Sequence, residues 1–353
     1  MLQRLRRRLS WTDVMMWLIG GAILVMVIAG SILTLSSGKY SVINWISLII
    51  DGLSLGSIYA LIALGYTLVY GILRMINFAH GEVFMSGPFA AYFVAIAFDR
   101  SGFLDRQPII ALFIILLMAM GISTTIAVLL ERIAYRPLRR APRLIPLITA
   151  IGASFFLQYS FRGLFGSGIK SYPELEILKG VWTVGAIRIQ RIEVVVIVSA
   201  LIMLLGLWLF VERTKVGKAM QAVSEDKDVA SLMGINVDQI IVITFVLGGA
   251  LAGAAGLLYA LQFRQVTFIM GFMPGLKAFT AAVLGGIGNV TGAALGGLFL
   301  GIAESLFPNL VLDGLGIPAP YQLRDALAFV LLVLVLIFRP TGIMGERLAV
   351  KKA

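Results

Sequence analysis

Residues 77 to 87, NFAHGEVFMSG, bring together the side chains of this sequence that are best suited to proton chemistry. They include His80, which is the only histidine, and the carboxylate of Glu82. An imidazole beside a carboxylate can act in acid–base catalysis, but residues two apart on a helix do not share a face. Since no serine–glycine elbow or second histidine accompanies the pair, we expect the chain not to be an enzyme.

Other patterns exclude further classes of protein. The sequence contains no cysteine and one histidine, so we expect no structural zinc, iron–sulfur cluster or disulfide. The stretch GLFGSGIKS (163–171) is similar to a phosphate-binding loop, but Ile169 separates Gly168 from Lys170, and the lysine of such a loop directly follows its last glycine. We therefore expect no metal and no cofactor in this chain, and no nucleotide hydrolysis by it.

Composition indicates an integral membrane protein. Of the 353 residues, 59% are hydrophobic and 13% are charged, and the mean hydropathy is +0.97. Several apolar runs reach the roughly 20 residues that a helix needs to cross a bilayer. Because a spanning segment must satisfy its own backbone hydrogen bonds, and no alternating strand pattern appears, we predict an all-α fold, a polytopic transmembrane helical bundle. The expected spans, about ten with some short or broken, lie near 14–35, 42–73, 83–98, 108–130, 144–165, 192–211, 239–261, 275–288, 290–307 and 326–338.

We treat residues 1–353 as a single transmembrane domain. The first apolar run, 14–35, could be a signal peptide, but it is longer than the roughly 7 to 15 residues of a signal h-region, which favours a retained helix. The net charge of +11 comes mainly from arginines in short runs between apolar segments, an arrangement typical of membrane proteins rather than of nucleic-acid binding.

The distribution of basic residues predicts a cytoplasmic N-terminus (1–13) and a cytoplasmic tail (339–353). The other inside segments are then 74–82, 131–143, 212–238 and a tight turn near 289. The basic residues that support this orientation are Arg132, Arg136, Arg139, Arg140, Arg143, Arg213, Lys215, Lys218, Arg339, Arg347, Lys351 and Lys352. The longest outside segment, 166–191, is expected to form an ordered loop or a small hairpin.

Glycines within the spans predict close helix packing. Four pairs have the small-residue spacing that lets helices approach in lipid: Gly52/Gly56, Gly249/Gly253, Gly292/Gly296 and Gly297/Gly301. Two glycine-rich regions also resemble each other, YGILRMINFAHGEVFMSG (70–87) and LGGIGNVTGAALGG (284–297). They predict an internal pseudo-repeat whose broken helices line a site near the membrane midplane.

Charged residues within spans are rare and costly, so each is a functional hypothesis. We identify Arg74, Glu82, Arg162 and Glu304. For Arg162 we expect the side chain to reach the outer interface. For Glu304 three roles stay open: an outer gate, an ion pair, or solvation at a helix end.

The loop 212–238 is expected to contain a short amphipathic helix at 217–235. Its apolar residues at helical spacing are Ala219, Ala222, Val223, Val229, Ala230 and Met233. Such a helix can lie on lipid headgroups or dock to a protein, and the acidic Glu225, Asp226 and Asp228 favour the protein. The stretch DVASLMG (228–234) resembles the EAA-type loop through which permeases of ATP-binding-cassette (ABC) importers contact their ATPases, although Val229 replaces one alanine.

A broader resemblance covers roughly residues 45 to 346. Residues 51–81, DGLSLGSIYALIALGYTLVYGILRMINFAHG, are similar to the start of LivH-type permeases of branched-chain amino acid ABC importers. Further similar stretches follow in order: ERIAYRPLRRAPRLIPLITAIGASFFLQ (131–158), GKAMQAVSEDKDVASLMGIN (217–236), AVLGGIGNVTGAALGG (282–297) and FRPTGIMGE (338–346).

This resemblance implies one permease subunit of an importer in a bacterial inner membrane. The implied partners are a LivM-like second permease, two cytoplasmic ATPases that bind the ATP, and a periplasmic or lipid-anchored solute-binding protein. The implied solutes are branched-chain or other neutral amino acids, and urea or short amides stay open as an alternative. A proton-coupled secondary transporter using His80 is the rival from another class. Whether the permease pairs with itself also stays open.

The expected substrate pathway follows from the need for non-helical backbone to be buried or to line water at membrane depth. Its residues are Asn77, Phe78, Ala79, His80, Gly81, Glu82, Gly285, Gly286, Gly288 and Asn289. The alternative is a structural hinge without solute contact. The residues expected to couple to the ATPases are Gly217, Ala219, Ala222, Asp228, Ala230 and Gly234.

Overall fold

The computed structural model describes residues 11–139, 141–142, 144–318, 320–339 and 341–345. Across these residues nine helices are long and apolar enough to cross a membrane, which confirms the predicted polytopic helical bundle. The positions Arg140, Arg143, Arg347, Lys351 and Lys352, together with residues 1–10, lie outside the described residues, so the expectations placed on them stay predictions.

Every expected span corresponds to a helix. The long helices and one short apolar helix are α1 (Trp11–Ser37), α2 (Val42–Leu73), α3 (His80–Arg100), α5 (Pro108–Leu129), α6 (Leu144–Phe165), α7 (Arg191–Arg213), α10 (Val237–Phe263), α11 (Phe272–Gly285), α12 (Val290–Phe307) and α13 (Arg324–Phe338). The remaining helical pieces are α4 (Phe103–Arg106), η2 (Leu130–Tyr135), η3 (Arg136–Leu138), η4 (Glu176–Leu178), α8 (Lys215–Glu225), α9 (Lys227–Leu232), η5 (Pro308–Leu312) and η6 (Pro320–Leu323).

One expected span is a short helix. The segment expected at 275–288 corresponds to α11, which has 14 residues and ends at Gly285. At 1.5 Å per residue such a helix is about 21 Å long, shorter than a hydrocarbon core of about 30 Å. The helix ends there because Gly286 has φ of +109°, a conformation that only glycine adopts readily.

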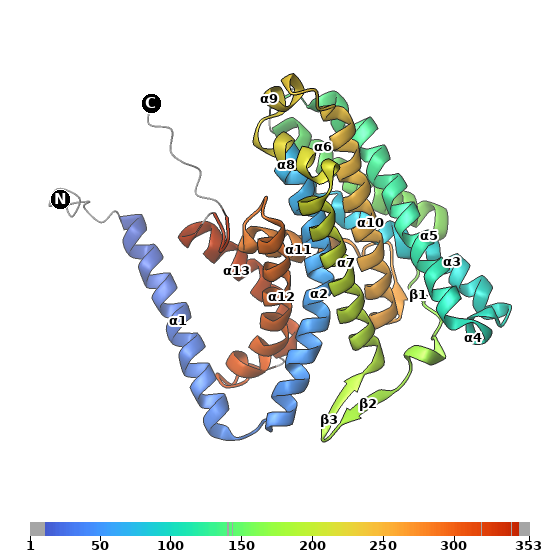
Figure 1. The fold of residues 1–353 in the computed structure, drawn as a ribbon. Helices are drawn as coiled ribbons and strands as arrows, with labels where there is room; N and C mark the ends of the chain where they lie inside the picture. Colours follow the sequence, from blue (N-terminus) through green and yellow to red (C-terminus); the bar gives the residue numbers. More distant parts are fainter. Residues whose placement is uncertain (1–10, 140, 143, 319, 340, 346–353) are drawn as a thin grey trace.

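Contacts group the loops at two ends of the bundle. The guanidinium of Arg74 donates to the Ser224 carbonyl at 2.8 Å, and Arg136 pairs with Asp238 at 3.0 Å. These contacts place the segments after α2, after η2 and around α8 at one end, which we call the α8–α9 end. It lies at the top of Figure 1.

The opposite end carries the hairpin expected between 166 and 191. Strands β2 (Val181–Val184) and β3 (Ile187–Gln190) pair antiparallel, and β1 (Lys170–Ser171) pairs with β4 (Gln265–Val266). The turn between α1 and α2 lies at the same end (Figure 1), where Lys39 pairs with Asp313 at 2.8 Å. This ion pair lowers the pKa of the Asp313 carboxyl below its ordinary value. The expected ordered hairpin is therefore confirmed.

The glycine pairs pack helices together as predicted. A Cβ atom at Gly56 would lie 2.9 Å from the Leu298 backbone, and one at Gly301 would overlap the backbone of Gly56. Helices α2 and α12 thus touch backbone to backbone. A Cβ at Gly249 would lie 2.8 Å from Thr124, so α10 and α5 approach equally closely.

Two long helices end at a residue in the left-handed conformation. Arg74 (φ 56°) ends α2 and Arg264 (φ 54°) ends α10, and each is followed by a non-helical segment and a new helix, α3 or α11. Helices α2 and α10 run in opposite directions, because α10 begins at the α8–α9 end and finishes beside β1. The non-helical segments that follow α2 and α10 therefore enter the bundle from opposite ends.

The second glycine-rich region has a different structure from the first. Residues 284–297 contain a tight turn, Gly286 to Asn289, between α11 and α12, whereas residues 74–79 form a re-entrant break before α3. The segment that corresponds to this break in the structure is 265–271, not 284–297. The expected pairing of regions 70–87 and 284–297 thus has no structural counterpart, and an internal repeat stays a prediction.

Candidate functional site

The first turns of α3 and α11 meet inside the bundle. The imidazole of His80 packs on Gly65, which lies eight residues, or about 12 Å, before the end of α2. Helix α3 therefore starts well below the α8–α9 end. A Cβ atom at Gly81 would lie 2.5 Å from the Gly271 carbonyl oxygen, and one at Gly275 would lie 2.9 Å from the Gly81 Cα. Only glycine at these positions permits the contact.

A cavity of about 230 Å³ lies beside this contact. Its lining is mostly apolar, with a hydroxyl, a phenol and a carboxylate among the side chains: Tyr66, Phe78, Gly81, Glu82, Ile151, Ser154, Phe155, Gly271, Phe272, Gly275 and Leu276. We call it the α3–α11 cavity. Three of these side chains, Ile151, Phe155 and Phe272, are also exposed on the surface of the bundle. The cavity therefore reaches the surface between α6 and α11.

The charged group of the cavity is the Glu82 carboxylate, only 1% of whose residue surface is exposed. Its Oε1 accepts hydrogen bonds from Gln158 Nε2 at 2.7 Å and from Ser154 Oγ at 3.2 Å, and its Oε2 has no partner. Neither α3 nor α11 has a side-chain cap at its N-terminus. Backbone carbonyls accept from the first amides of both helices, for example Ile269 from Phe272, and Pro274 has no N–H. The helix dipole nevertheless gives both helix starts a partial positive charge.

Residues 77 to 82 divide into four groups. Phe78, Gly81 and Glu82 line the α3–α11 cavity. Asn77 lines a small neighbouring cavity and accepts a hydrogen bond from the Tyr135 hydroxyl at 2.5 Å. His80 lies on another face of α3 from Glu82, as its spacing predicts, with its ring centroid 4.8 Å from that of Tyr66 and with Nε2 unpartnered. Ala79 is buried and precedes α3 as its N-cap.

The four pathway residues expected between 285 and 289 do not line the α3–α11 cavity. Asn289 caps α12 by accepting from the Gly292 amide at 2.8 Å, and it donates to the Met344 carbonyl at 3.2 Å. Gly285 is buried against Gly292 of α12, Gly286 is buried against the segment 341–345, and Gly288 is exposed near Gly71. Their role in solute passage stays a prediction.

Sequence reasoning missed a buried cation. The Lys277 ammonium, in α11, donates to Glu304 Oε1 at 2.6 Å, to Asp325 at 2.6 Å and to the Tyr59 hydroxyl at 3.3 Å. Arg324 also donates to Glu304 Oε1, at 2.9 Å. This ion-pair cluster joins α2, α11, α12 and α13, and it decides among the roles left open for Glu304 in favour of an ion pair. The sequence did contain the signal for this cation, because a lysine, Lys277, lies inside the expected apolar span 275–288.

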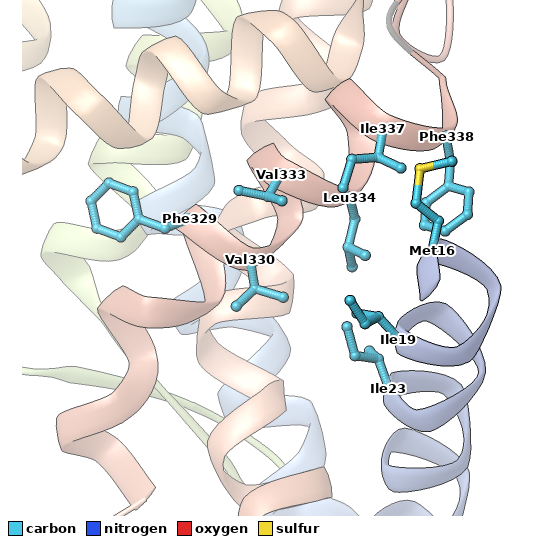
Figure 2. Close-up of a pocket in the computed structure, with 9 residues that line it drawn as sticks. All are labelled: Met16, Ile19, Ile23, Phe329, Val330, Val333, Leu334, Ile337 and Phe338. Atoms are coloured by element: carbon cyan, nitrogen blue, oxygen red, sulfur yellow. The ribbon is translucent and has the colours of Figure 1, made fainter. Parts of the chain in front are cut away.

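A larger cavity, about 320 Å³, lies between α1 and α13. Figure 2 shows Ile19 and Ile23 of α1 directed toward Val330 and Leu334 of α13. Its lining is wholly apolar: Met16, Ile19, Ile23, Phe329, Val330, Val333, Leu334, Ile337 and Phe338. A zwitterionic or hydrogen-bonding solute finds no polar partner there, so this cavity is a poor candidate for a solute site.

The segment expected to form one helix at 217–235 forms two, α8 and α9. The helix breaks at Asp226, because its carboxylate accepts from the amides of Asp228 and Val229 and so caps a new helix. Burial and the guanidinium groups of Arg139 and Arg74 lower the pKa of the adjacent Lys227 ammonium.

The expected coupling residues differ in exposure. Gly217 and Ala230 are buried, Ala219 is half-buried, and Ala222, Asp228 and Gly234 are exposed. Beyond Ala230, Leu232 is 87% exposed and Met233 is 78% exposed. Two such apolar side chains on a charged turn form an exposed apolar patch, which we call the α9 patch.

The helical bundle holds a cavity between the starts of α3 and α11, and this cavity opens at the bundle surface. These features define a membrane transport subunit. Consistent with this class, the chain belongs to the family described as branched-chain amino acid transport system / permease component, whose model matches residues 48–336.

Two curated relatives are similar to most of the chain. The high-affinity branched-chain amino acid transport system permease protein BraD of Pseudomonas aeruginosa is 44% identical over 311 residues, which covers 86% of this chain and 96% of BraD. The corresponding protein LivH of Escherichia coli is 42% identical, over 84% of this chain and 94% of LivH. Among solved structures, PsaBC from Streptococcus pneumoniae is similar with a TM-score of 0.43 and 14% identity, over 87% of this chain and 96% of that one, a likeness too weak to define a shared fold.

Proposed function

We propose that this permease carries branched-chain amino acids into the cytoplasm as one membrane subunit of an ABC importer in a bacterial inner membrane. The observation that carries the solute assignment is the α3–α11 cavity. Its volume of about 230 Å³ is below the roughly 300 to 1,000 Å³ of pockets for drug-sized ligands, so it suits a small solute. The relatives BraD and LivH, named as branched-chain amino acid permeases, support the same solute class.

The lining of the cavity matches the parts of such a solute. Phe78, Phe155 and Leu276 offer apolar contacts to an aliphatic side chain, while the helix starts and Glu82 offer polar ones. Urea and short amides have little apolar surface to bury, so this lining favours the amino acid over the amide alternative.

The partners of this subunit follow from its exposed surfaces. The α9 patch, at the end proposed to face the cytoplasm, would dock to a cytoplasmic ATPase that binds the ATP, because an exposed apolar patch marks a protein interface. A second, LivM-like permease would cover the mouth of the cavity at Ile151, Phe155 and Phe272. A solute-binding protein would deliver the amino acid at the opposite end, beside the β2–β3 hairpin. In this orientation both chain termini are cytoplasmic, and this chain itself needs no cofactor.

Transport would proceed by alternating access. Closure of the ATPases on ATP would move α8 and α9, and the contact of Arg74 with Ser224 would transmit this movement to the break before α3. Because α3 and α11 meet through glycine backbones, movement of α3 would open one side of the cavity and close the other.

The test is uptake of labelled leucine by proteoliposomes that contain this chain with its neighbouring permease, ATPases and binding protein. We expect uptake that requires internal ATP and that excess urea does not reduce. Uptake driven by a proton gradient without ATP would contradict the importer class, and uptake suppressed by urea would contradict the solute. Vesicles with a hydrolysis-deficient ATPase subunit serve as the control.

A further inference from the structure

Of the four buried glutamates among the described residues, Glu82 is the one that combines an unpartnered oxygen with the lack of an ion pair. The carboxylate of Glu304 pairs with Lys277 and Arg324, and that of Glu131 pairs with Arg139. Glu82 takes part in none of the ion pairs found among the described residues. A buried carboxylate without a cation is unfavourable. The other one, Glu193, accepts from the Gln190 amide in the cap of α7, whereas Glu82 caps no helix.

The two oxygens of Glu82 have different surroundings. Its Oε1 is held by Gln158 and Ser154 of α6, which fixes the direction of the carboxylate. Its Oε2 accepts no hydrogen bond and faces Gly271, where a Cβ atom would lie 3.0 Å from it. One oxygen is thus positioned by the protein, and the other has no donor and is buried beside Gly271. Movement of α3 away from α11 during transport would open it to a donor inside the cavity.

The donor that fits is a cation small enough for the cavity. An ammonium group supplies up to three N–H donors and a positive charge, which together satisfy the free oxygen and compensate its charge. Neutral donors such as an amide would satisfy the oxygen but leave the charge uncompensated. The start of α11, about one helical turn from Gly275, offers positive partial charge to a carboxylate on the same solute.

We infer that Glu82 binds the α-ammonium group of the amino acid in transit, while the N-terminus of α11 receives its α-carboxylate. This inference rests on the proposed function and deepens it, because it makes the cavity selective for zwitterions. Solutes that lack a positive charge, including urea and short amides, leave Glu82 unpaired and are disfavoured at this step, independently of the solute-binding protein.

The first test compares Glu82→Gln and Glu82→Asp with wild type in the reconstituted importer. We expect Glu82→Gln to reduce ATP-dependent leucine uptake at least about tenfold, because a hydrogen bond to a charged group is much stronger than a neutral one. Stimulation of ATP hydrolysis by the leucine-loaded binding protein should persist, since the α9 patch is unchanged. Glu82→Asp, which keeps the charge, should retain more uptake than Glu82→Gln. Asp99→Asn removes an exposed carboxylate from the same helix and should transport like wild type.

The outcomes separate this inference from the proposed function. Wild-type uptake of leucine together with normal uptake by Glu82→Gln would overturn the role of Glu82 and leave the importer assignment intact. Equal loss in Glu82→Gln and Glu82→Asp, with normal assembly, would show that side-chain length rather than charge matters, and would also overturn it. Absence of leucine uptake by the wild-type importer would overturn the proposed function itself.

A second test keeps Glu82 and therefore does not depend on folding of its variants. The sequence has no cysteine, so Ser154→Cys gives this chain one thiol, beside the Glu82 carboxylate. For each reagent, the rate with this thiol is divided by its rate with a free thiol in solution. We expect this relative rate to be at least about tenfold higher for a cationic aminoethyl thiosulfonate than for an anionic sulfonatoethyl one, because the unpaired carboxylate attracts cations. Equal relative rates would contradict an unpaired negative charge in the cavity.

Discussion

Gly81 and Gly271 pack backbone against backbone, so that a Cβ atom at Gly81 would lie 2.5 Å from the Gly271 carbonyl oxygen. This contact joins the starts of two helices that follow chain breaks at opposite ends of the bundle. It fixes the shape of the α3–α11 cavity, and the predictions below begin from it.

Gly81→Ala should force α3 and α11 apart. We expect a loss of stability of about 1 to 3 kcal/mol, typical of overpacking, and a large loss of leucine uptake. Thermal unfolding in detergent and uptake in proteoliposomes measure the two effects. Gly121→Ala is the matched control, since nothing lies within 4 Å of a Cβ at that position. Wild-type uptake by Gly81→Ala would show that the two helix starts need not touch.

Lys277→Met should destabilise the bundle because it removes the central cation of a buried cluster. Loss of one partner of a buried ion pair typically lowers the free energy of unfolding by about 3 to 5 kcal/mol. Because Arg324 still pairs with Glu304 in this variant, we expect a loss near the lower end of that range. Thermal unfolding in detergent is the measurement, and the exposed Lys179→Met is the control. The double variant Lys277→Met/Glu304→Gln should recover part of the loss. Failure of the double variant to recover any stability would argue against an ion-pair role.

Changes in the α9 patch should uncouple transport from ATP hydrolysis. Leu232→Asp or Gly234→Trp should reduce binding of the ATPase subunits to the solubilised permease at least about tenfold, as expected for an apolar anchor at an interface. Co-purification with the ATPases measures this directly. Val184→Asp places the same charge on an exposed apolar position at the opposite end and should not change ATPase binding. Normal ATPase binding by both α9 variants would remove the docking role of this patch.

His80→Gln should leave the pH dependence of transport unchanged. Its imidazole is buried against Gly65 and Tyr66 and does not line the α3–α11 cavity, so we expect it not to move protons with the solute. Leucine uptake measured between about pH 5 and 8, the range over which histidine commonly titrates, tests this. A pH profile that changes on substitution would revive the proton-coupled alternative.

The sequence predicted the helices well because their signal is local. Apolar runs bounded by turn residues placed α2 at 42–73 and α12 at 290–307, the bounds that the structure shows. The spacing of His80 and Glu82 likewise predicted that their side chains point in different directions.

Features that depend on tertiary contacts were not predictable in the same way. Nothing near Glu82 in sequence identifies Ser154 or Gln158 as its partners, since they lie more than 70 positions away. The meeting of Gly81 with Gly271 depends on two breaks that enter from opposite ends. Lys277 was overlooked within an apolar run, although its charge alone was a sufficient signal. The break at Asp226 was also readable, because an aspartate before a helical pattern is a common N-cap.

The most direct test of the central claim is whether the amino acid passes through the α3–α11 cavity. In the assembled importer containing Ser154→Cys, the rate of thiol modification is measured by mass spectrometry with and without leucine-loaded binding protein and ATP. Ser123→Cys, buried between α5 and α3, is the control that should not react. Our account predicts that transport of leucine slows modification of Ser154→Cys and that modification blocks uptake. Modification at the same rate in both conditions, with uptake unaffected, would show that the solute takes another path.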